Sequence, residues 1–156
     1  MKKLWILLAN YSIFVFLAIG IWVGLMPGGL VYIFLSLLAV IIGRGVFCKL
    51  FYILYPKRRP YQSGALEPPF SIFFSWKKLS ADSFPSGHVT SLVGISVVFG
   101  SFNVWVGLLC FVIALITGIA RVRLKYHYPV DVFGGVILGI FTGFVVLYLG
   151  KVMHLY

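Results

Sequence analysis

Long apolar runs separated by short polar stretches dominate the chain. No charged residue occurs from Leu4 to Met26 or from Val132 to Leu149, and the apolar run from Leu30 to Tyr55 is interrupted only by Arg44 and Lys49. An α-helix needs about 20 predominantly apolar residues to cross a hydrocarbon layer about 30 Å thick. Each run therefore predicts a membrane-spanning helix, over residues 4–26, 29–55 and 130–150.

The remaining apolar run, from Val89 to Ala120, is too long for one span. As a single straight helix it would reach about 48 Å at 1.5 Å per residue, well beyond the hydrocarbon core. The turn-forming residues Gly100 to Asn103 lie near its middle. We therefore expect two helices, over residues 86–101 and 103–122, joined by a tight hairpin, which brings the number of spans to five.

Composition indicates a membrane protein with an all-α fold. Hydrophobic residues make up 62% of the 156 residues and charged residues 10%, whereas about a quarter of a soluble domain is charged. The long connection over residues 56–85 carries several prolines and should not form one regular helix. The expected architecture is a polytopic membrane helix bundle of about five transmembrane helices, forming a single membrane domain over residues 1–156.

Three polar blocks interrupt this apolar chain. They are Arg59-Pro60, then Pro85-Ser86-Gly87-His88, then Arg121 with His127 and Asp131 spaced after it. Five spans bring the helix ends that carry these blocks to one membrane face. Ionisable groups are costly within or at the edge of a bilayer, so they indicate a functional site. We therefore expect an active site at that face.

The second block suits the binding of phosphate. Ser86, Gly87 and His88 begin a predicted helix, where unpaired backbone N–H groups and the positive end of the helix dipole attract anions. Gly87 permits close approach of the backbone, and the Ser86 hydroxyl adds a donor.

The third block adds a nucleophile. Pro129 favours the first turn of the last helix, which places Asp131 in that turn and His127 just before it. A carboxylate there could accept the proton of one imidazole nitrogen and leave the other nitrogen free to attack. Arg121 ends the preceding helix, from which its guanidinium can reach the same anion.

The same residues allow three other interpretations. His88, His127 and Asp131 could ligate zinc or iron, but the basic residues nearby would crowd a divalent cation. Ser86 could act as a nucleophile activated by His88, although a serine at a helix start suits anion binding better. A non-enzymatic lipid-headgroup binder or transporter would not need the oriented imidazole of His127.

The three blocks resemble, in their order, the signature motifs of the type 2 phosphatidic acid phosphatase superfamily, which includes integral-membrane lipid phosphatases. The second block is complete, and the third differs in that Ala120 stands where the motif has serine. In the first block Tyr52 occupies the place of a lysine seven residues before Arg59. We favour Lys49, one helical turn earlier on the same face, over the nearer alternatives Lys57 and Arg58.

The resemblance implies a role for each matching residue. His127 attacks phosphorus to give a phosphohistidine, Asp131 orients and charges the imidazole, and His88 protonates the leaving oxygen and then activates water. The expected phosphate-binding residues are Arg59, Arg121, Ser86, Gly87 and Lys49. Neither a metal nor another cofactor is expected, because arginine and lysine side chains supply the positive charge.

The resemblance also implies a lipid substrate. The basic residues are spread over loops at a membrane face, which favours anionic lipid headgroups over nucleic acid, and no obligatory protein partner is inferred. Bacterial members act on undecaprenyl pyrophosphate, phosphatidylglycerophosphate, phosphatidate or the 1-phosphate of lipid A. Basic residues outside the three blocks favour a large, multiply anionic headgroup, which means lipid A or a pyrophosphate lipid rather than phosphatidate. The small size of the chain resembles that of small lipid A 1-phosphatases.

The net charge of +10 is concentrated at the predicted active-site face. The positive-inside rule taken alone would place that face in the cytoplasm. An anion-binding site needs the same basic residues, however, so charge leaves the orientation open. The resemblance implies a multi-pass protein of the bacterial inner membrane whose active site faces the periplasm.

Overall fold

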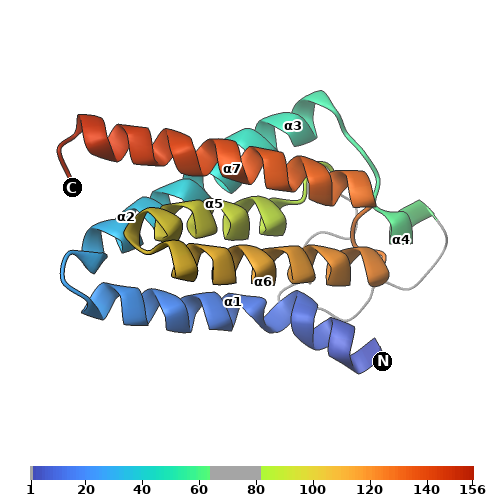
Figure 1. Cartoon of the computed structure of the whole chain (residues 1–156). Coiled ribbons are helices and arrows are strands. Elements are labelled where there is room, and N and C mark those ends of the chain that lie inside the picture. The colour runs from blue at the N-terminus through green and yellow to red at the C-terminus, as the bar shows by residue number, and fades with distance from the viewer. Residues whose placement is uncertain (1, 64–81) are drawn as a thin grey trace.

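The computed structural model describes residues 2–63 and 82–156, and every regular element in these ranges is a helix (Figure 1). This confirms the all-α membrane bundle expected from the sequence; that the chain forms one domain stays a prediction. The elements are α1 (Lys2–Leu25), α2 (Gly29–Val40), the π-helix η1 (Ile41–Cys48), α3 (Lys49–Leu54), α4 (Pro60–Ser63), α5 (Gly87–Phe102), α6 (Val104–Arg123) and α7 (Pro129–Val152).

Four helical segments are long and apolar enough to cross a membrane. They are α1, α6, α7 and the continuous segment Gly29–Leu54, which joins α2, η1 and α3. The fifth expected span, α5, is shorter, with 16 residues. Large apolar side chains on the outer helices point away from the bundle, among them Leu17, Trp105 and Phe133, as lipid-facing positions should.

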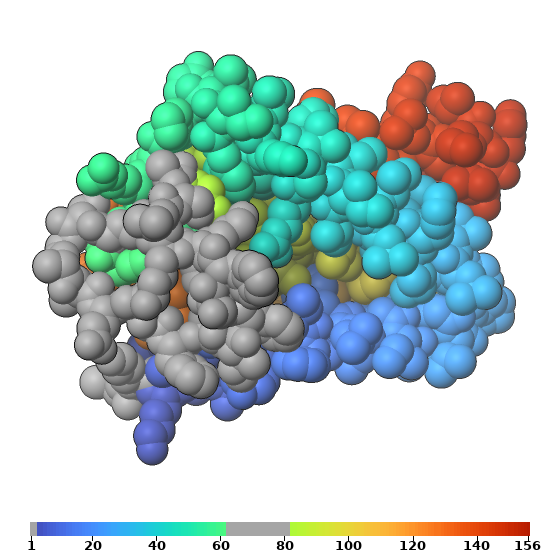
Figure 2. Space-filling model, turned by 180° about the vertical axis from the view of Figure 1, so that it is seen from behind, coloured from blue at the N-terminus to red at the C-terminus, as the bar shows by residue number. Residues whose placement is uncertain are grey.

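Helix α5 lies in the centre of the bundle (Figure 1). It packs against α2, η1, α6 and α7, and ten of its 16 residues are buried. Val89, Val93 and Phe99 of α5 form a core with Phe16 and Val23 of α1. A helix that is apolar on all sides needs such cover. From behind, the α2–η1–α3 segment crosses the face of the bundle above α1 (Figure 2).

The hairpin expected near Asn103 is present. Asn103 has extended backbone angles and separates α5 from α6. Its side-chain Oδ1 accepts the backbone N–H groups of Trp105 and Val106 at 3.0 and 3.2 Å, which caps α6. Gly107 faces Gly100 so closely that a Cβ on it would lie 2.3 Å from the Gly100 Cα. The hairpin therefore returns the chain directly along α5.

The N-terminus of α5 lies further inside the bundle than the end of α6 and the start of α7 (Figure 1). A backbone bond from the Ser86 N–H to the Asp131 carbonyl, at 2.8 Å, ties this recessed helix start to α7. The connection over 56–85 contributes the short helix α4 and a single parallel bridge between Lys57 and Asp82. Its aromatic and lysine-rich part, including Lys77 and Lys78, lies outside the described residues.

Candidate active site

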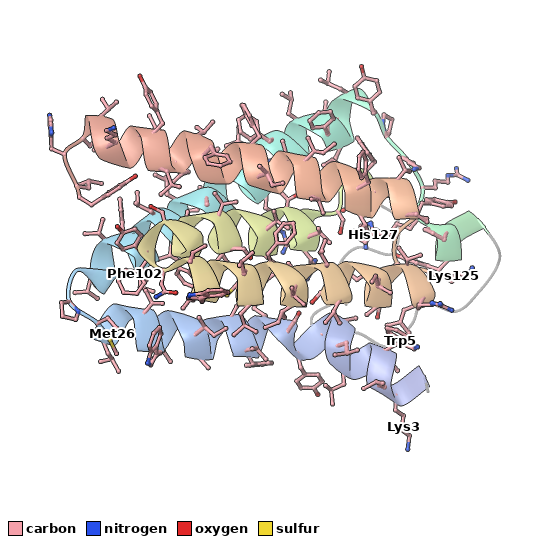
Figure 3. All side chains as sticks on the ribbon, in the orientation of Figure 1. Lys3, Trp5, Met26, Phe102, Lys125 and His127 are labelled. Atoms are coloured by element: carbon pink, nitrogen blue, oxygen red, sulfur yellow. The ribbon has the colours of Figure 1, made fainter. Side chains whose placement is uncertain are left out.

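The predicted site residues gather at one end of the bundle. Arg59 follows α3, His88 lies in the first turn of α5, Arg121 in the last turn of α6, and Asp131 in the first turn of α7. Figure 3 places His127 at the same end as Lys125 and Lys3, with Met26 and Phe102 at the other.

Ser83 holds the imidazole of His127. The His127 Nδ1 lies 2.9 Å from the backbone carbonyl oxygen of Ser83, and the His127 side chain is 2% exposed. A carbonyl oxygen can only accept a hydrogen bond, so Nδ1 carries the proton. The other nitrogen, Nε2, therefore keeps its lone pair and is able to attack an electrophile.

Asp131 reaches His127 through Ser83 rather than directly. Its carboxylate accepts hydrogen bonds from the Ser83 hydroxyl, from the Tyr128 N–H at 2.8 Å and from the Lys57 ammonium at 2.7 Å. The distance from Asp131 Oδ2 to His127 Nδ1 is 3.7 Å, too long for a hydrogen bond. The proton acceptor expected to be Asp131 is thus the Ser83 carbonyl, while the carboxylate anchors the Ser83 side chain and supplies negative charge nearby.

His127 is neutral at physiological pH. Burial lowers the pKa of its imidazole to about 4; the neighbouring Asp131 opposes this shift, and the positive charges of Arg59 and Arg121 add to it. A neutral imidazole is the form that acts as a nucleophile. The site therefore keeps His127 in its reactive state.

Two buried arginines, Arg59 and Arg121, interact electrostatically with the histidines. Arg59 is 8% exposed, and its Nη2 donates to the Asp82 carbonyl at 3.2 Å and pairs with the Asp82 carboxylate at 3.3 Å. Arg121 is 5% exposed, and its Nε has no hydrogen-bond partner among the described residues. A buried guanidinium with an unfilled donor is suited to an anionic ligand.

The start of α5 adds further unfilled donors. Ser86 is the N-cap of α5, and its fully buried hydroxyl has no hydrogen-bond partner within the part of the chain that the structure describes. The first backbone N–H groups of a helix lack partners inside it. The positive charges of Arg121, Arg44 and Arg59 interact electrostatically with His88 in the first turn. The arrangement fits a phosphate group held between His88 and His127.

The place of the family lysine is occupied differently from the expectation. The Tyr52 hydroxyl donates to the Pro85 carbonyl at 2.9 Å, and Lys57 is engaged by Asp131. Lys49 is exposed, and its role as a phosphate ligand stays a prediction. Arg44, which was not predicted from the sequence as a site residue, interacts electrostatically with His88. Its position inside an apolar run was the signal in the sequence that could have identified it.

Sequence reasoning also missed Ser83, and it treated Lys57 only as a substitute phosphate ligand. No spacing rule marks these two positions, because both lie in irregular backbone. Among residues 2–63 and 82–156, no group of three or more His, Cys, Asp or Glu side chains is placed to hold a metal ion. That the protein works without a metal stays a prediction.

Comparison with known proteins gives consistent matches. The family model described as the PAP2 superfamily matches residues 29–152. Undecaprenyl-diphosphatase BcrC of Bacillus subtilis (strain 168) is 39% identical over 62 residues, which cover 40% of this chain and 32% of that protein. Putative undecaprenyl-diphosphatase YbjG of Escherichia coli (strain K12) is 32% identical over 88 residues, 55% of this chain and 41% of that protein. The chain thus aligns with less than half the length of these relatives. No solved structure matches it significantly.

Proposed function

The chain belongs to the PAP2 superfamily, and from this we propose that it is a membrane phosphatase that removes the terminal phosphate of a polyprenyl diphosphate lipid. The names of the two relatives support a diphosphate substrate. The four helical segments long enough to cross a bilayer support a lipid substrate. A buried site with unfilled cationic and hydroxyl donors supports a phosphate ligand.

The observation that carries this proposal is the hydrogen bond from His127 Nδ1 to the Ser83 carbonyl. It leaves the Nε2 lone pair free in a neutral ring. In the first step Nε2 forms a bond to phosphorus, and the bond between phosphorus and the leaving oxygen breaks. His88, which takes up a proton when the anionic substrate binds beside it, gives that proton to the leaving oxygen. The products of this step are a phosphohistidine and a lipid with one phosphate fewer.

In the second step His88, now neutral, accepts a proton from water as the water oxygen attacks phosphorus. The bond between phosphorus and Nε2 breaks, inorganic phosphate leaves, and both histidines regain their starting states. Arg59 and Arg121, with the Ser86 hydroxyl and the Gly87 N–H, neutralise the equatorial oxygens. Phosphoryl transfer depends mainly on such positioning and charge stabilisation.

The proposed location is the bacterial inner membrane, with the active site facing the periplasm. The apolar segments place the chain in a membrane, and both relatives are bacterial. A lipid substrate would reach the recessed start of α5 from the bilayer.

Phosphate release in detergent tests the proposal. The panel comprises undecaprenyl diphosphate, phosphatidylglycerophosphate, phosphatidate and lipid A 1-phosphate, and we expect the diphosphate to be hydrolysed with the highest kcat/KM. His127→Ala should abolish turnover, and rapid quenching of the native enzyme should trap phosphate on His127. Ser86→Ala should slow the reaction while leaving it detectable. A trapped phosphate on Ser86, or activity that survives His127→Ala, would contradict the mechanism.

A further inference from the structure

Arg44 lies within a membrane segment, in the π-helix η1. A charged side chain inside a membrane span is costly and indicates a function. π-helical turns inside longer helices are often found at functional sites. Arg44 is also exposed, whereas Arg59 and Arg121 are buried. A charged Arg44 side chain at this position in the membrane segment should therefore have an anionic partner.

The Arg44 side chain runs alongside the start of α5. A Cβ built on Gly87 would lie 3.4 Å from the Arg44 Cγ, 3.7 Å from its Cδ, and 3.1 Å from the Tyr52 Oη. The aliphatic part of Arg44 thus covers Gly87, the residue whose N–H opens the predicted phosphate site. Arg44 is close enough to act electrostatically on His88 and on Arg121.

The three arginines are distributed unequally between the two histidines. The positive charges of Arg59 and Arg121 interact electrostatically with both His88 and His127. The Arg44 side chain, by contrast, packs on Gly87, the residue directly before His88, and its charge interacts electrostatically with His88. Arg44 therefore lies on the His88 side of the site.

The side of the phosphorus atom on which a cation lies determines which part of the substrate that cation can stabilise. In a phosphoryl transfer the attacking and leaving atoms are roughly in line on opposite sides of phosphorus. His127 is the proposed nucleophile, and His88 the proposed donor to the leaving oxygen. A cation beside His88 would therefore lie against the leaving group, while Arg59 and Arg121 are the proposed ligands of the phosphate that is transferred.

We propose that Arg44 binds the lipid-linked phosphate of a diphosphate substrate, and that it thereby sets the preference for lipid diphosphates over lipid monophosphates. This rests on the proposed phosphatase function. In a diphosphate the leaving group carries a phosphate next to the scissile bond, and a monophosphate has a neutral alkyl oxygen there. The leaving group also carries the lipid tail, which agrees with the exposure of Arg44 on the outer segment of the bundle.

Two substrates with the same tail provide the test. Farnesyl diphosphate and farnesyl monophosphate are assayed by phosphate release in matched detergent. For Arg44→Ala we expect kcat/KM on the diphosphate to fall by about 10²–10³, the cost of one lost charge-stabilising donor at an active site. On the monophosphate the fall should be less than about tenfold, since a donor that faces no charge adds little. Arg44→Lys should recover part of the diphosphate activity.

Arg123→Ala is the matched control. It removes the same charge at the same end of the bundle, from an exposed guanidinium that lies 5.9 Å from the Trp5 ring, and both activities should stay within about twofold of the native values. Lys49→Ala tests the competing cation and should leave the ratio of the two activities unchanged.

The outcomes distinguish the role of Arg44 from the phosphatase function itself. Equal losses on both substrates, or no loss, would overturn the role of Arg44 and leave the phosphatase function standing. A selective loss in Lys49→Ala, with none in Arg44→Ala, would give the role to Lys49. A native enzyme that hydrolyses neither substrate, nor any lipid of the panel above, would overturn the proposed function itself. Retained monophosphate activity in Arg44→Ala shows directly that the variant is folded.

Discussion

At the scale of single residues, Ser83 connects the acid and the nucleophile. Its carbonyl oxygen holds His127 Nδ1 at 2.9 Å, and its hydroxyl bonds to Asp131. Asp131 in turn pairs with Lys57 at 2.7 Å. The imidazole is therefore oriented by a neutral carbonyl whose own position depends on a partly buried ion pair.

Ser83→Ala should lower kcat by about 10–100-fold with little change in KM, because a hydrogen bond to a charged group contributes about 1.5–3 kcal/mol and the carbonyl that orients His127 remains. Asp131→Asn should cost more, since it also removes the charge that pairs with Lys57. Steady-state kinetics on the same lipid provide the measurement. Ser96→Ala, which removes a hydroxyl bonded within α5 to the Leu92 carbonyl, is the control. Equal rates for Ser83→Ala and this control would rule out the proposed connection.

The imidazole of His127 should titrate near pH 4, because burial lowers its pKa and Arg59 and Arg121 lower it further. The unfolded chain binds that proton near pH 6.5. The folded state therefore loses stability as the pH falls from about 6.5 to about 4. In the folded protein the imidazole stays neutral, and thus nucleophilic, above about pH 4. Histidine-labelled NMR in micelles measures the value, with His127→Asn for assignment. A midpoint at 6 or above would contradict the described burial.

At the scale of elements, the apolar runs predicted the helices well. Chain segments in hydrocarbon must satisfy their backbone groups internally, so length and hydropathy suffice to place them. Length and hydropathy do not predict the positions of residues such as Ser83 and Lys57. These positions depend on tertiary pairing between the irregular stretch near Asp82 and the start of α7.

Arg44 escaped prediction for a different reason. The prediction that Lys49 binds phosphate assumed a regular α-helix over residues 29–55. In the structure, residues Ile41–Cys48 form a π-helix. A π turn closes with bonds five residues apart instead of four, so side chains four positions apart stay more nearly in line. Arg44, Cys48 and Tyr52 accordingly interact with one another along one side of the segment. A helix-period pattern does not reveal this shift.

At the element scale, Gly139 on α7 lies where two helices approach each other closely. A Cβ on Gly139 would lie 2.7 Å from both the Thr90 carbonyl and the Val93 Cβ of α5. Gly139→Ala should therefore separate α7 from α5 and lower the free energy of unfolding by about 1–3 kcal/mol.

Gly45→Ala is the matched control, because an added Cβ there meets no atom within 4 Å. Thermal unfolding in detergent compares the two variants. If Gly139→Ala melted at the temperature of Gly45→Ala, the close approach of α5 and α7 would not be needed for stability.

At the scale of the whole molecule, the basic end of the bundle is also the end that holds the site. The positive-inside rule and the proposed function make opposite statements about which compartment this end faces. The two native cysteines, Cys48 and Cys110, are fully buried. Engineered cysteines therefore report orientation with little background.

Lys125→Cys should react with a membrane-impermeant maleimide in intact cells after the outer membrane is opened, because the proposed site faces the periplasm. Met26→Cys, at the opposite end (Figure 3), should react only after the cells are lysed. Phosphatase activity of the labelled protein confirms that it is folded. The reverse pattern of labelling would place the active site in the cytoplasm and favour the charge rule over the proposed orientation.

The shortness of α5 sets a limit on the shape of the substrate. Its 16 residues span about 24 Å, less than the hydrocarbon thickness of about 30 Å, and its start is recessed beneath the ends of α6 and α7 (Figure 1). A phosphate must descend below the level of the surrounding headgroups to meet Ser86 and His88. A terminal phosphate without a substituent is small enough to reach these two residues. A phosphate that carries a sugar or another bulky group is too large to pass between the ends of the surrounding helices. A phosphatase of the proposed kind would then act on lipids with an unsubstituted terminal phosphate and not on lipids whose phosphate carries a further group.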